Sequence, residues 1–281
     1  MAIGRLLVAL VVVLVTAGNC ASVPGMGSVG EGSAHRSVAV GDTDREYRVY
    51  RPKGISGPAP LVMVLHGYTG NAAQAEEEFG WNELADQKHF VAAYPEGLNE
   101  GFNAGGCCGA SSDDGVDDVA AVLAMLDDVA AAVPLDPERL YVTGFSNGGA
   151  MAYRLACETD RFAAFGPVAG GLVANCQDPE PTSILHVHGT SDRVVPFDGV
   201  TDIWRTPVVE VLADWRERDD CGTPAATTKG RTQLTTASCA AGREVGLLAV
   251  DGLDHAWPTA DDGLDATETL WAFFERHPRG H

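Results

Sequence analysis

The chain has 281 residues, of which 45% are hydrophobic and 21% charged, so it can build a full core. A chain of this length buries roughly three quarters of its unfolded surface on folding, and its hydrophobic content excludes a disordered protein. Its 19 Lys and Arg residues against 39 Asp and Glu give a formal net charge of −20, which argues against nucleic acid and acidic lipid surfaces as partners.

The N-terminal residues 1–19 have the pattern of an export signal peptide. Arg5 supplies the positive charge, Leu6–Val15 is an unbroken run of ten apolar residues, and Thr16, Ala17 and Gly18 are small, as expected near a cleavage site. Ten residues are too few to cross a bilayer core about 30 Å thick as a helix. We therefore expect export, and no segment that spans a membrane.

Cys20 introduces a second interpretation of the same segment. Thr16–Cys20 resembles a bacterial lipoprotein cleavage box, in which Cys20 would carry the lipid, although Ala17 and Asn19 depart from the usual residues. Without Cys20, six cysteines remain, an even number that suits three disulfides in an oxidising compartment and allows fifteen pairings. These are Cys107, Cys108, Cys157, Cys176, Cys221 and Cys239. Lipidation and plain secretion both stay open at this point.

From residue 20 onwards, a tether precedes a patterned domain. Residues 20–35 are small and turn-rich, which predicts a flexible tether, and residues 36–281 are predicted to form one catalytic domain. Strands are expected over Glu46–Pro52 (an edge strand), Leu61–Leu65, Phe90–Tyr94, Leu140–Thr143, Phe165–Ala169, Ser183–His188 and Val245–Val250. Helices are expected over Asn71–Lys88, Val116–Val133, Gly148–Cys157, Val208–Arg218 and Ala266–His277. This alternation predicts an α/β fold whose mainly parallel sheet has helices on both faces.

One predicted segment stands outside this alternation. Gly222–Gly242 is rich in Thr and Gly, and Cys221 and Cys239 bracket it. We expect an excursion on the surface, which a disulfide between those two cysteines would pin.

The most informative motif is Gly144-Phe145-Ser146-Asn147-Gly148-Gly149. It follows one predicted strand and precedes a predicted helix, which is the context of a Gly-x-Ser-x-Gly nucleophile elbow. A serine hydroxyl is a poor nucleophile near pH 7, so a histidine must accept its proton and an acid must orient that histidine. In this arrangement the acid and then the histidine follow the serine along the chain.

His255 is the predicted base, since it lies in a short loop between the last strand and the last helix. The acid expected is Asp192, which leaves the end of the Ser183–His188 strand, with Asp198, Asp251 and Asp254 as alternatives. His186 and His188 precede that acid, so they stand in the wrong order for the base.

The oxyanion of an acyl-transfer reaction needs hydrogen-bond donors, and two backbone N–H groups are candidates. The N–H of Asn147 is free at the start of the nucleophile helix, and the N–H of Tyr68 lies in the turn after the first buried strand. His66 would then hold the turn without acting as a base. The spacing of His and Cys residues fits no zinc site, so we expect neither a metal nor a cofactor.

Together these motifs resemble the secreted polyhydroxybutyrate depolymerase, feruloyl esterase and acetylxylan esterase group of α/β-hydrolases. The resemblance rests, in chain order, on Leu65-His66-Gly67, Ala93–Gly97, Asn103–Gly109, Val116–Val119, Tyr141–Gly149, Met151–Cys157, Pro167–Gly170, His186–Asp192 and His255–Pro258. It implies the α/β-hydrolase fold, with Ser146 as nucleophile, Asp192 as orienting acid and His255 as base. It also implies that the loop at Asn103 and the ring of Trp257 contact the substrate. Phe102 and Tyr68 depart from the residues common in the group, which leaves the choice of ester open.

The predicted function is therefore a secreted serine esterase that forms an acyl-enzyme intermediate, without cofactor, acting on small or polymeric esters. The expected protein is a monomer, extracellular or held at the cell surface by lipid on Cys20. Hydroxyalkanoate polyesters and feruloyl or acetyl esters of plant polysaccharide are both candidate substrates. Two alternatives remain: a serine peptidase of prolyl-oligopeptidase type, and a non-catalytic binding module of the cell surface on a hydrolase scaffold.

Overall fold

A computed structural model describes residues 27–279 of the chain; the predicted signal peptide, Cys20 and the first part of the predicted tether lie outside these residues. The strands are β1 (Gly32–Val40), β2 (Thr43–Arg51), β3 (Ala59–Leu65), β4 (Val91–Pro95), β5 (Leu135–Phe145), β6 (Ala164–Val168), β7 (Ser183–Gly189), β8 (Ala225–Lys229), β9 (Thr232–Ser238) and β10 (Glu244–Val250). The helices are α1 (Ala72–Glu78), α2 (Trp81–Lys88), α3 (Gly109–Asp113), α4 (Asp118–Ala132), α5 (Asn147–Glu158), α6 (Val208–Arg218) and α7 (Ala266–Phe274).

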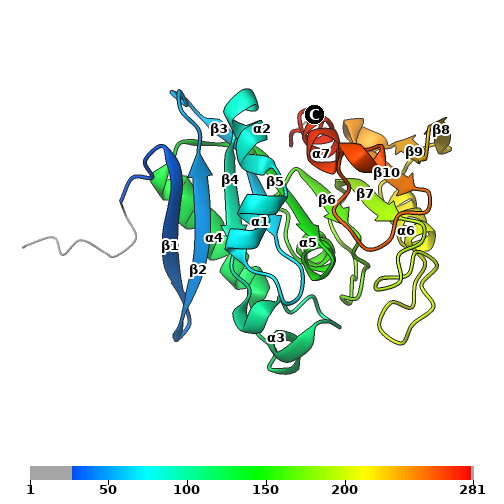
Figure 1. Ribbon diagram of the computed structural model, residues 1–281, viewed down its shortest axis with the longest axis horizontal. Helices are drawn as coiled ribbons and strands as arrows, with labels where there is room; N and C mark the ends of the chain where they lie inside the picture. The colour runs from blue at the N-terminus through cyan, green and yellow to red at the C-terminus, as the bar shows by residue number, and fades with distance from the viewer. Residues whose placement is uncertain (1–26, 280–281) are drawn as a thin grey trace, which may run out of the picture.

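All of these strands join one mixed sheet in the order β1-β2-β4-β3-β5-β6-β7-β10-β9-β8 (Figure 1). Its centre, from β4 through β3, β5, β6 and β7 to β10, is parallel throughout, whereas both margins are antiparallel. The carboxyl ends of the parallel strands therefore meet at one edge of the sheet, where loops from distant parts of the sequence lie side by side.

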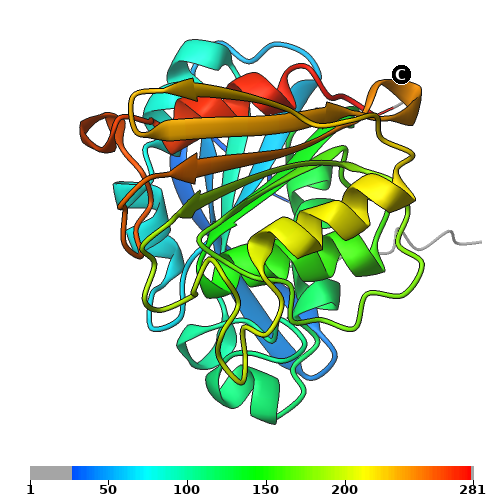
Figure 2. The same ribbon diagram turned by 90° about the vertical axis from the view of Figure 1, so that its right-hand side faces the viewer.

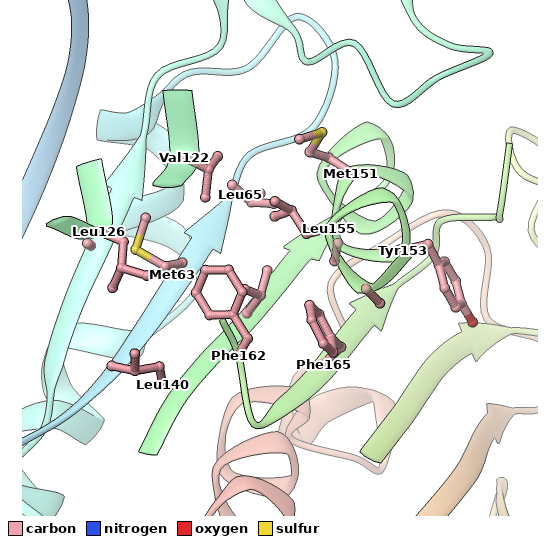
Figure 3. Close-up of a cluster of buried hydrophobic side chains, with 14 of the residues drawn as sticks. Met63, Leu65, Val122, Leu126, Leu140, Met151, Tyr153, Leu155, Phe162 and Phe165 are labelled. Atoms are coloured by element: carbon pink, nitrogen blue, oxygen red, sulfur yellow. The ribbon is translucent and has the colours of Figure 1, made fainter. Parts of the chain in front are cut away.

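Helices cover both faces of the sheet, as the apolar pattern predicts. In β3, Leu61, Met63 and Leu65 pack into one hydrophobic cluster with α4, α5 and α6, while Val62 and Val64 face a second cluster built with α1, α2 and α7. Figure 2 shows α6 (yellow) and α7 (red) on opposite sides of the strands, and Figure 3 shows the interior of the first cluster. Full burial on both faces explains why the central strands are continuous apolar runs.

The sheet margins differ from prediction. β1 begins at Gly32, so residues 32–35 belong to a strand and the tether predicted to reach residue 35 is too long. Because β1 pairs outside β2, the strand expected over Glu46–Pro52 is the second from the edge. At the opposite margin, the Gly222–Gly242 excursion forms a β8–β9 hairpin that extends the sheet.

One predicted helix is divided in two. The helical pattern of Asn71–Lys88 is interrupted at Gly80, whose φ of 71° lies in the left-handed region that glycine tolerates. The two parts, α1 and α2, each bury their own apolar residues against the same face of the sheet.

The six cysteines of the domain pair as Cys107–Cys108, Cys157–Cys176 and Cys221–Cys239. The last pair holds both ends of the excursion, as expected. Within residues 27–279, no helix is long and apolar enough to pass through a bilayer.

Candidate active site

Ser146 occupies a sharp turn between β5 and α5. Its φ of 56° and ψ of −116° are strained for a residue with a side chain. The flanking glycines are required by close backbone contacts: a Cβ on Gly148 would lie 2.3 Å from the Leu65 carbonyl oxygen, and one on Gly144 would lie 2.5 Å from the Gly148 carbonyl. The Gly-x-Ser-x-Gly pattern thus follows from the packing of β3, β5 and α5 against one another.

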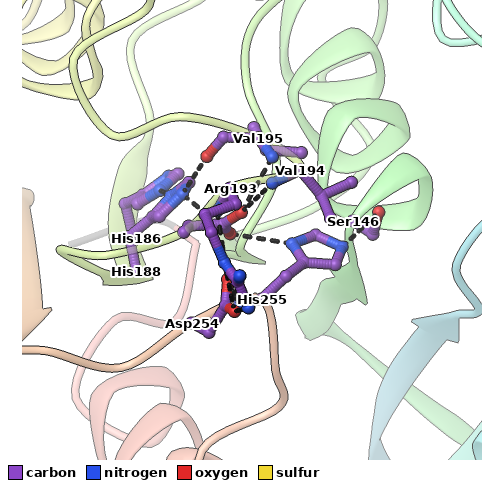
Figure 4. Close-up of polar contacts among 9 residues, drawn as sticks. Ser146, His186, His188, Arg193, Val194, Val195, Asp254 and His255 are labelled. Carbon is purple, nitrogen blue, oxygen red and sulfur yellow. Dashed lines mark hydrogen bonds and ion pairs between the residues drawn. The ribbon is translucent and has the colours of Figure 1, made fainter.

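Three loops at the carboxyl edge of the sheet bring Ser146, His255 and Asp192 together. Figure 4 shows the His255 ring beside Ser146. His255 Nε2 lies 2.9 Å from Ser146 Oγ, and His255 Nδ1 lies 2.7 Å from Asp192 Oδ2. A carboxylate can only accept, so Nδ1 carries the proton of neutral His255 and the Nε2 lone pair faces the serine hydroxyl. This geometry allows Ser146 to be deprotonated as it attacks a carbonyl carbon.

Asp192 is held as an ionised acceptor. Its side chain is fully buried, which by itself raises the pKa of a carboxyl group. Hydrogen bonds from His188, His255 and the Val195 N–H outweigh burial and hold the pKa of Asp192 well below its ordinary value. Oδ1 accepts from the N–H groups of Val194 and Val195, at 2.9 and 2.8 Å, leaving Oδ2 toward His255.

Asp254, an alternative acid from the sequence, has a different position. Its Oδ2 accepts from Arg193 Nε at 2.8 Å, and its Oδ1 accepts from the N–H of His255 at 2.9 Å. The Arg193 guanidinium and these N–H groups lower the pKa of Asp254 to about 2. Asp254 therefore ties the loop of the base to the loop of the acid, and it does not contact the His255 ring nitrogens.

The predicted oxyanion donors belong to two segments that adjoin the serine. Asn147 is the first residue of α5, and the N–H groups of a helix's first turn have no partner within the helix. The turn before Tyr68 packs on the nucleophile, since a Cβ on Gly67 would lie 3.5 Å from Ser146 Cβ. His66 fixes this turn: its Nε2 accepts from the Gly97 N–H at 3.0 Å and its Nδ1 donates to the Gly67 carbonyl at 2.7 Å. Burial lowers the pKa of His66, consistent with a neutral structural residue.

The side chain of Asn147 has a second role that sequence reasoning missed. Its Oδ1 accepts from the Phe102 N–H at 2.7 Å, and its Nδ2 donates to the Phe102 carbonyl at 2.9 Å. The residue after the nucleophile thereby holds the loop that carries Asn103 and the Cys107–Cys108 pair against the elbow.

The side chain of Asn103, a predicted substrate contact, makes its hydrogen bonds within its own loop. The residue is buried, its Nδ2 donates to the Val116 carbonyl and its Oδ1 accepts from the Gly105 N–H. Its backbone N–H donates to buried Asp118, which also pairs with Arg45. Both polar groups of the side chain thus shape the loop, and the contact of this loop with substrate stays a prediction.

Trp257 is half-buried beside the base. Its ring stacks on Phe79 with centroids 4.4 Å apart, and its Nε1 donates to Thr267 Oγ1 at 3.0 Å. These contacts anchor the loop of His255 to α1 and α7. Phe145 contacts both Phe79 and the His255 ring, so aromatic side chains pack against the base.

Comparisons with known proteins identify the family of this chain. Residues 45–242 match the family model described as esterase PHB depolymerase. The chain belongs to this family. The matched residues include Ser146 and the loop of Asp192, while His255 lies beyond them.

Relatives of this chain include proteins named as esterases. The chain is 34% identical to the protein NocK of Nocardia uniformis subsp. tsuyamanensis, over 79% of this chain and 73% of that protein. It is 30% identical to feruloyl esterase C of Emericella nidulans, over 82% of this chain and 83% of that protein. The acetyl xylan esterase from Aspergillus awamori has the same fold, with a TM-score of 0.62 and 15% identity over 86% of this chain and 99% of that one.

The predicted α/β-hydrolase fold is therefore confirmed, and the chain is a carboxylic ester hydrolase. Of the three functions considered from the sequence, the esterase is the one that family membership supports. The serine peptidase and the binding module have no such support among the relatives named above.

Proposed function

We propose that this esterase cleaves its substrate through an acyl-enzyme intermediate on Ser146, with His255 as general base and acid and Asp192 as the orienting carboxylate. The observation that carries the proposal is the pair of contacts on His255, 2.9 Å to Ser146 Oγ and 2.7 Å to Asp192 Oδ2. Both fall within the range for proton transfer along a hydrogen bond.

In the first half-reaction, Ser146 Oγ bonds to the ester carbonyl carbon while its proton passes to His255 Nε2. The carbonyl oxygen becomes an oxyanion, which the N–H groups of Asn147 and Tyr68 would stabilise. The bond to the alcohol oxygen then breaks, and His255 returns the proton to the leaving alcohol. Water repeats the sequence: it attacks the acyl carbon, and Ser146 leaves as the hydroxyl.

We further propose that the acyl group is a hydroxycinnamoyl group, as in the named activity of the relative from Emericella nidulans. A cavity of about 200 Å³ adjoins the turn that carries Tyr68. The aromatic side chains of Tyr68, Phe79 and Phe145 line part of it. Gly67 lines the same cavity and packs on Ser146, which connects this aromatic space to the nucleophile. Hydroxyalkanoate polyesters and acetylated xylan are the other candidates, the former from the family's description.

The test is one substrate panel on the purified mature protein: methyl ferulate, acetylated xylan, hydroxybutyrate oligomers and short p-nitrophenyl esters. Ser146→Ala should lower turnover of every substrate that the wild type hydrolyses by several orders of magnitude, because the triad acts as a unit. Ser238→Ala, at an exposed position in β9, is the matched control and should hydrolyse at the wild-type rate. Wild-type hydrolysis by Ser146→Ala would refute the nucleophile, and a preference for hydroxybutyrate oligomers over methyl ferulate would refute the acyl group.

We also propose that the protein acts outside the cytoplasm as a monomer. The signal-like residues 1–19 and the three disulfide pairs support export. Lipid attachment at Cys20 is tested by detergent-phase partitioning of the native protein and of Cys20→Ala. If Cys20 carries lipid, only the native protein enters the detergent phase; if both stay in the aqueous phase, the protein is secreted free.

A further inference from the structure

A continuous chain of buried side chains runs from α5 through β7 to the acid of the triad. Tyr153 Oη lies 2.7 Å from His186 Nδ1, His186 Nε2 lies 2.8 Å from His188 Nδ1, and His188 Nε2 lies 2.8 Å from the Val195 carbonyl oxygen. The same nitrogen of His188 lies 3.3 Å from Asp192 Oδ2. Figure 4 shows His186 and His188 together on one side of the site, with His255 and Ser146 on the other.

The two histidines lie on one face of a buried strand. Residues 186 and 188 are separated by two positions, so their side chains project from the same face of β7. Their rings are parallel within 8°, with centroids 5.1 Å apart, and neither residue is exposed. Burial lowers the pKa of His186 well below its ordinary value, so this imidazole is neutral at neutral pH.

For neutral rings, the Val195 carbonyl sets the direction of every hydrogen bond in this series. A backbone carbonyl can only accept, so His188 must carry its proton on Nε2 and donate toward Val195 and Asp192. The other nitrogen of neutral His188 then accepts from His186 Nε2–H, and His186 Nδ1 accepts from the Tyr153 hydroxyl. No other arrangement of neutral rings gives each nitrogen a partner.

We propose that His188 is a positioning residue for Asp192, a role that rests on the proposed function. Its Nε2–H gives the carboxylate a further donor, on the oxygen that faces His255, and His186 and Tyr153 hold that donor in the required tautomer. The four donors on Asp192 come from both sides: two N–H groups of its own loop, His188 on one side and His255 on the other. The carboxylate therefore cannot rotate away from His255 without losing at least one of them.

His188 also affects how strongly the Asp192 carboxylate attracts the proton of His255. A donor on Asp192 Oδ2 withdraws charge from the oxygen to which His255 Nδ1–H donates. Without it, the carboxylate stabilises the protonated His255 ring more strongly, so protonation of the base becomes more favourable. The ionisable groups that face this chain are Tyr153, Asp192, His255 and Arg216, which lies on α6 near the Tyr153 hydroxyl.

The test compares His188→Phe with two other variants of the full-length protein. His188→Gln keeps an N–H donor near the position of Nε2. His277→Phe removes a different buried histidine that also contacts a backbone carbonyl, 2.8 Å from Phe273 O. His277 borders a cavity with Ser183, at the opposite end of β7 from Asp192, so it controls for the loss of a buried imidazole.

For His188→Phe we expect kcat to fall about 10- to 100-fold, the effect of losing one hydrogen bond to a charged group, with KM unchanged. The acid limb of kcat/KM should move to higher pH, since it reports the base of the free enzyme. His188→Gln should restore both toward the wild type, and His277→Phe should lower thermal stability only. Equal losses in His188→Phe and His277→Phe, or an acid limb that stays in place or moves to lower pH, would overturn the proposal.

A second readout does not depend on turnover. The His255 Nδ1–H proton, in its hydrogen bond to Asp192, can be followed by NMR with and without His188. The midpoint of its titration should rise in His188→Phe and not in His277→Phe; an unchanged midpoint refutes the role of His188 even if no tested ester is a substrate. Failure of the proposed function is recognised separately, by wild-type hydrolysis in Ser146→Ala.

Discussion

Asp192→Asn is the substitution whose effect the geometry specifies in most detail. Two backbone N–H groups, at 2.9 and 2.8 Å, donate to Oδ1. The amide oxygen of asparagine must take that position, since an NH₂ group there would face two donors. The NH₂ group then points at His255 and His188, where the structure has an acceptor.

The consequence is the wrong tautomer of the base. His255 Nδ1 can no longer donate, so the ring carries its proton on Nε2 and presents an N–H, in place of a lone pair, to Ser146 Oγ. Loss of activity from this cause is about 10⁴-fold in a serine triad, or about 5 kcal/mol of transition-state stabilisation. The fold should survive, because the substitution conserves volume and the contacts of Oδ1.

The assay is kcat/KM for a p-nitrophenyl ester near neutral pH, with circular dichroism to confirm folding. Asp254→Asn is the matched control, because it changes the carboxylate next to His255 in sequence. Asparagine keeps an oxygen that can accept from the His255 N–H, and the exposed ion pair with Arg193 contributes little, so this variant should retain activity within about threefold. The reasoning would be refuted if Asp192→Asn lost less than about tenfold while folded, or if Asp254→Asn lost as much.

Three further predictions concern stability and the support of the base. Replacing Cys221 and Cys239, 18 positions apart, with serine should lower the free energy of unfolding by about 3 kcal/mol in a denaturant titration; unchanged stability would contradict a constraining role for this pair. Burial raises the pKa of Asp219 to about 6 from 3.8, so this carboxyl destabilises the fold as pH rises through that range. Asp219→Asn should therefore stabilise the protein by about 1 to 3 kcal/mol at pH 8 and not below pH 4. Thermal melts measure this, with Asp220→Asn as the control. An equal gain in stability at both pH values would contradict the destabilisation by ionised Asp219. Trp257→Phe keeps an aromatic ring on Phe79 but loses the hydrogen bond to Thr267. We therefore expect the free energy of unfolding to fall by about 1 kcal/mol with KM unchanged. A changed KM for aromatic esters would instead indicate that Trp257 contacts the acyl group.

The sequence predicted the centre of the molecule better than its margins. Buried parallel strands such as β3 are apolar on both faces, so their residues alone mark them. β1 pairs on one side only, and its alternation of small and polar residues, such as Ser33 and Ser37, resembles a tether. The break at Gly80 was also missed, because the apolar spacing continues across it.

The triad could be predicted because each member follows a strand in the order that the elbow imposes. The same order excluded His186 and His188 as candidates for the base, because both precede Asp192 along the chain. Their hydrogen bonds in the folded structure identified them instead. The signal that the sequence offers is their spacing, because two histidines at alternate positions of an otherwise apolar strand share one buried face and need partners there. Asn103 was assigned to the substrate because its loop adjoins the site, whereas its hydrogen bonds to Val116 and Gly105 depend on how that loop closes.

The central claim is that Ser146 carries the acyl group during turnover. The most direct measurement is to quench a reaction with a p-nitrophenyl ester in acid within milliseconds and to map the modified peptide by mass spectrometry. We predict the acyl mass on the peptide that contains Ser146, and its absence in Ser146→Ala. Turnover that continues with the acyl group on another side chain, or with no acylated protein at any time, would contradict the mechanism.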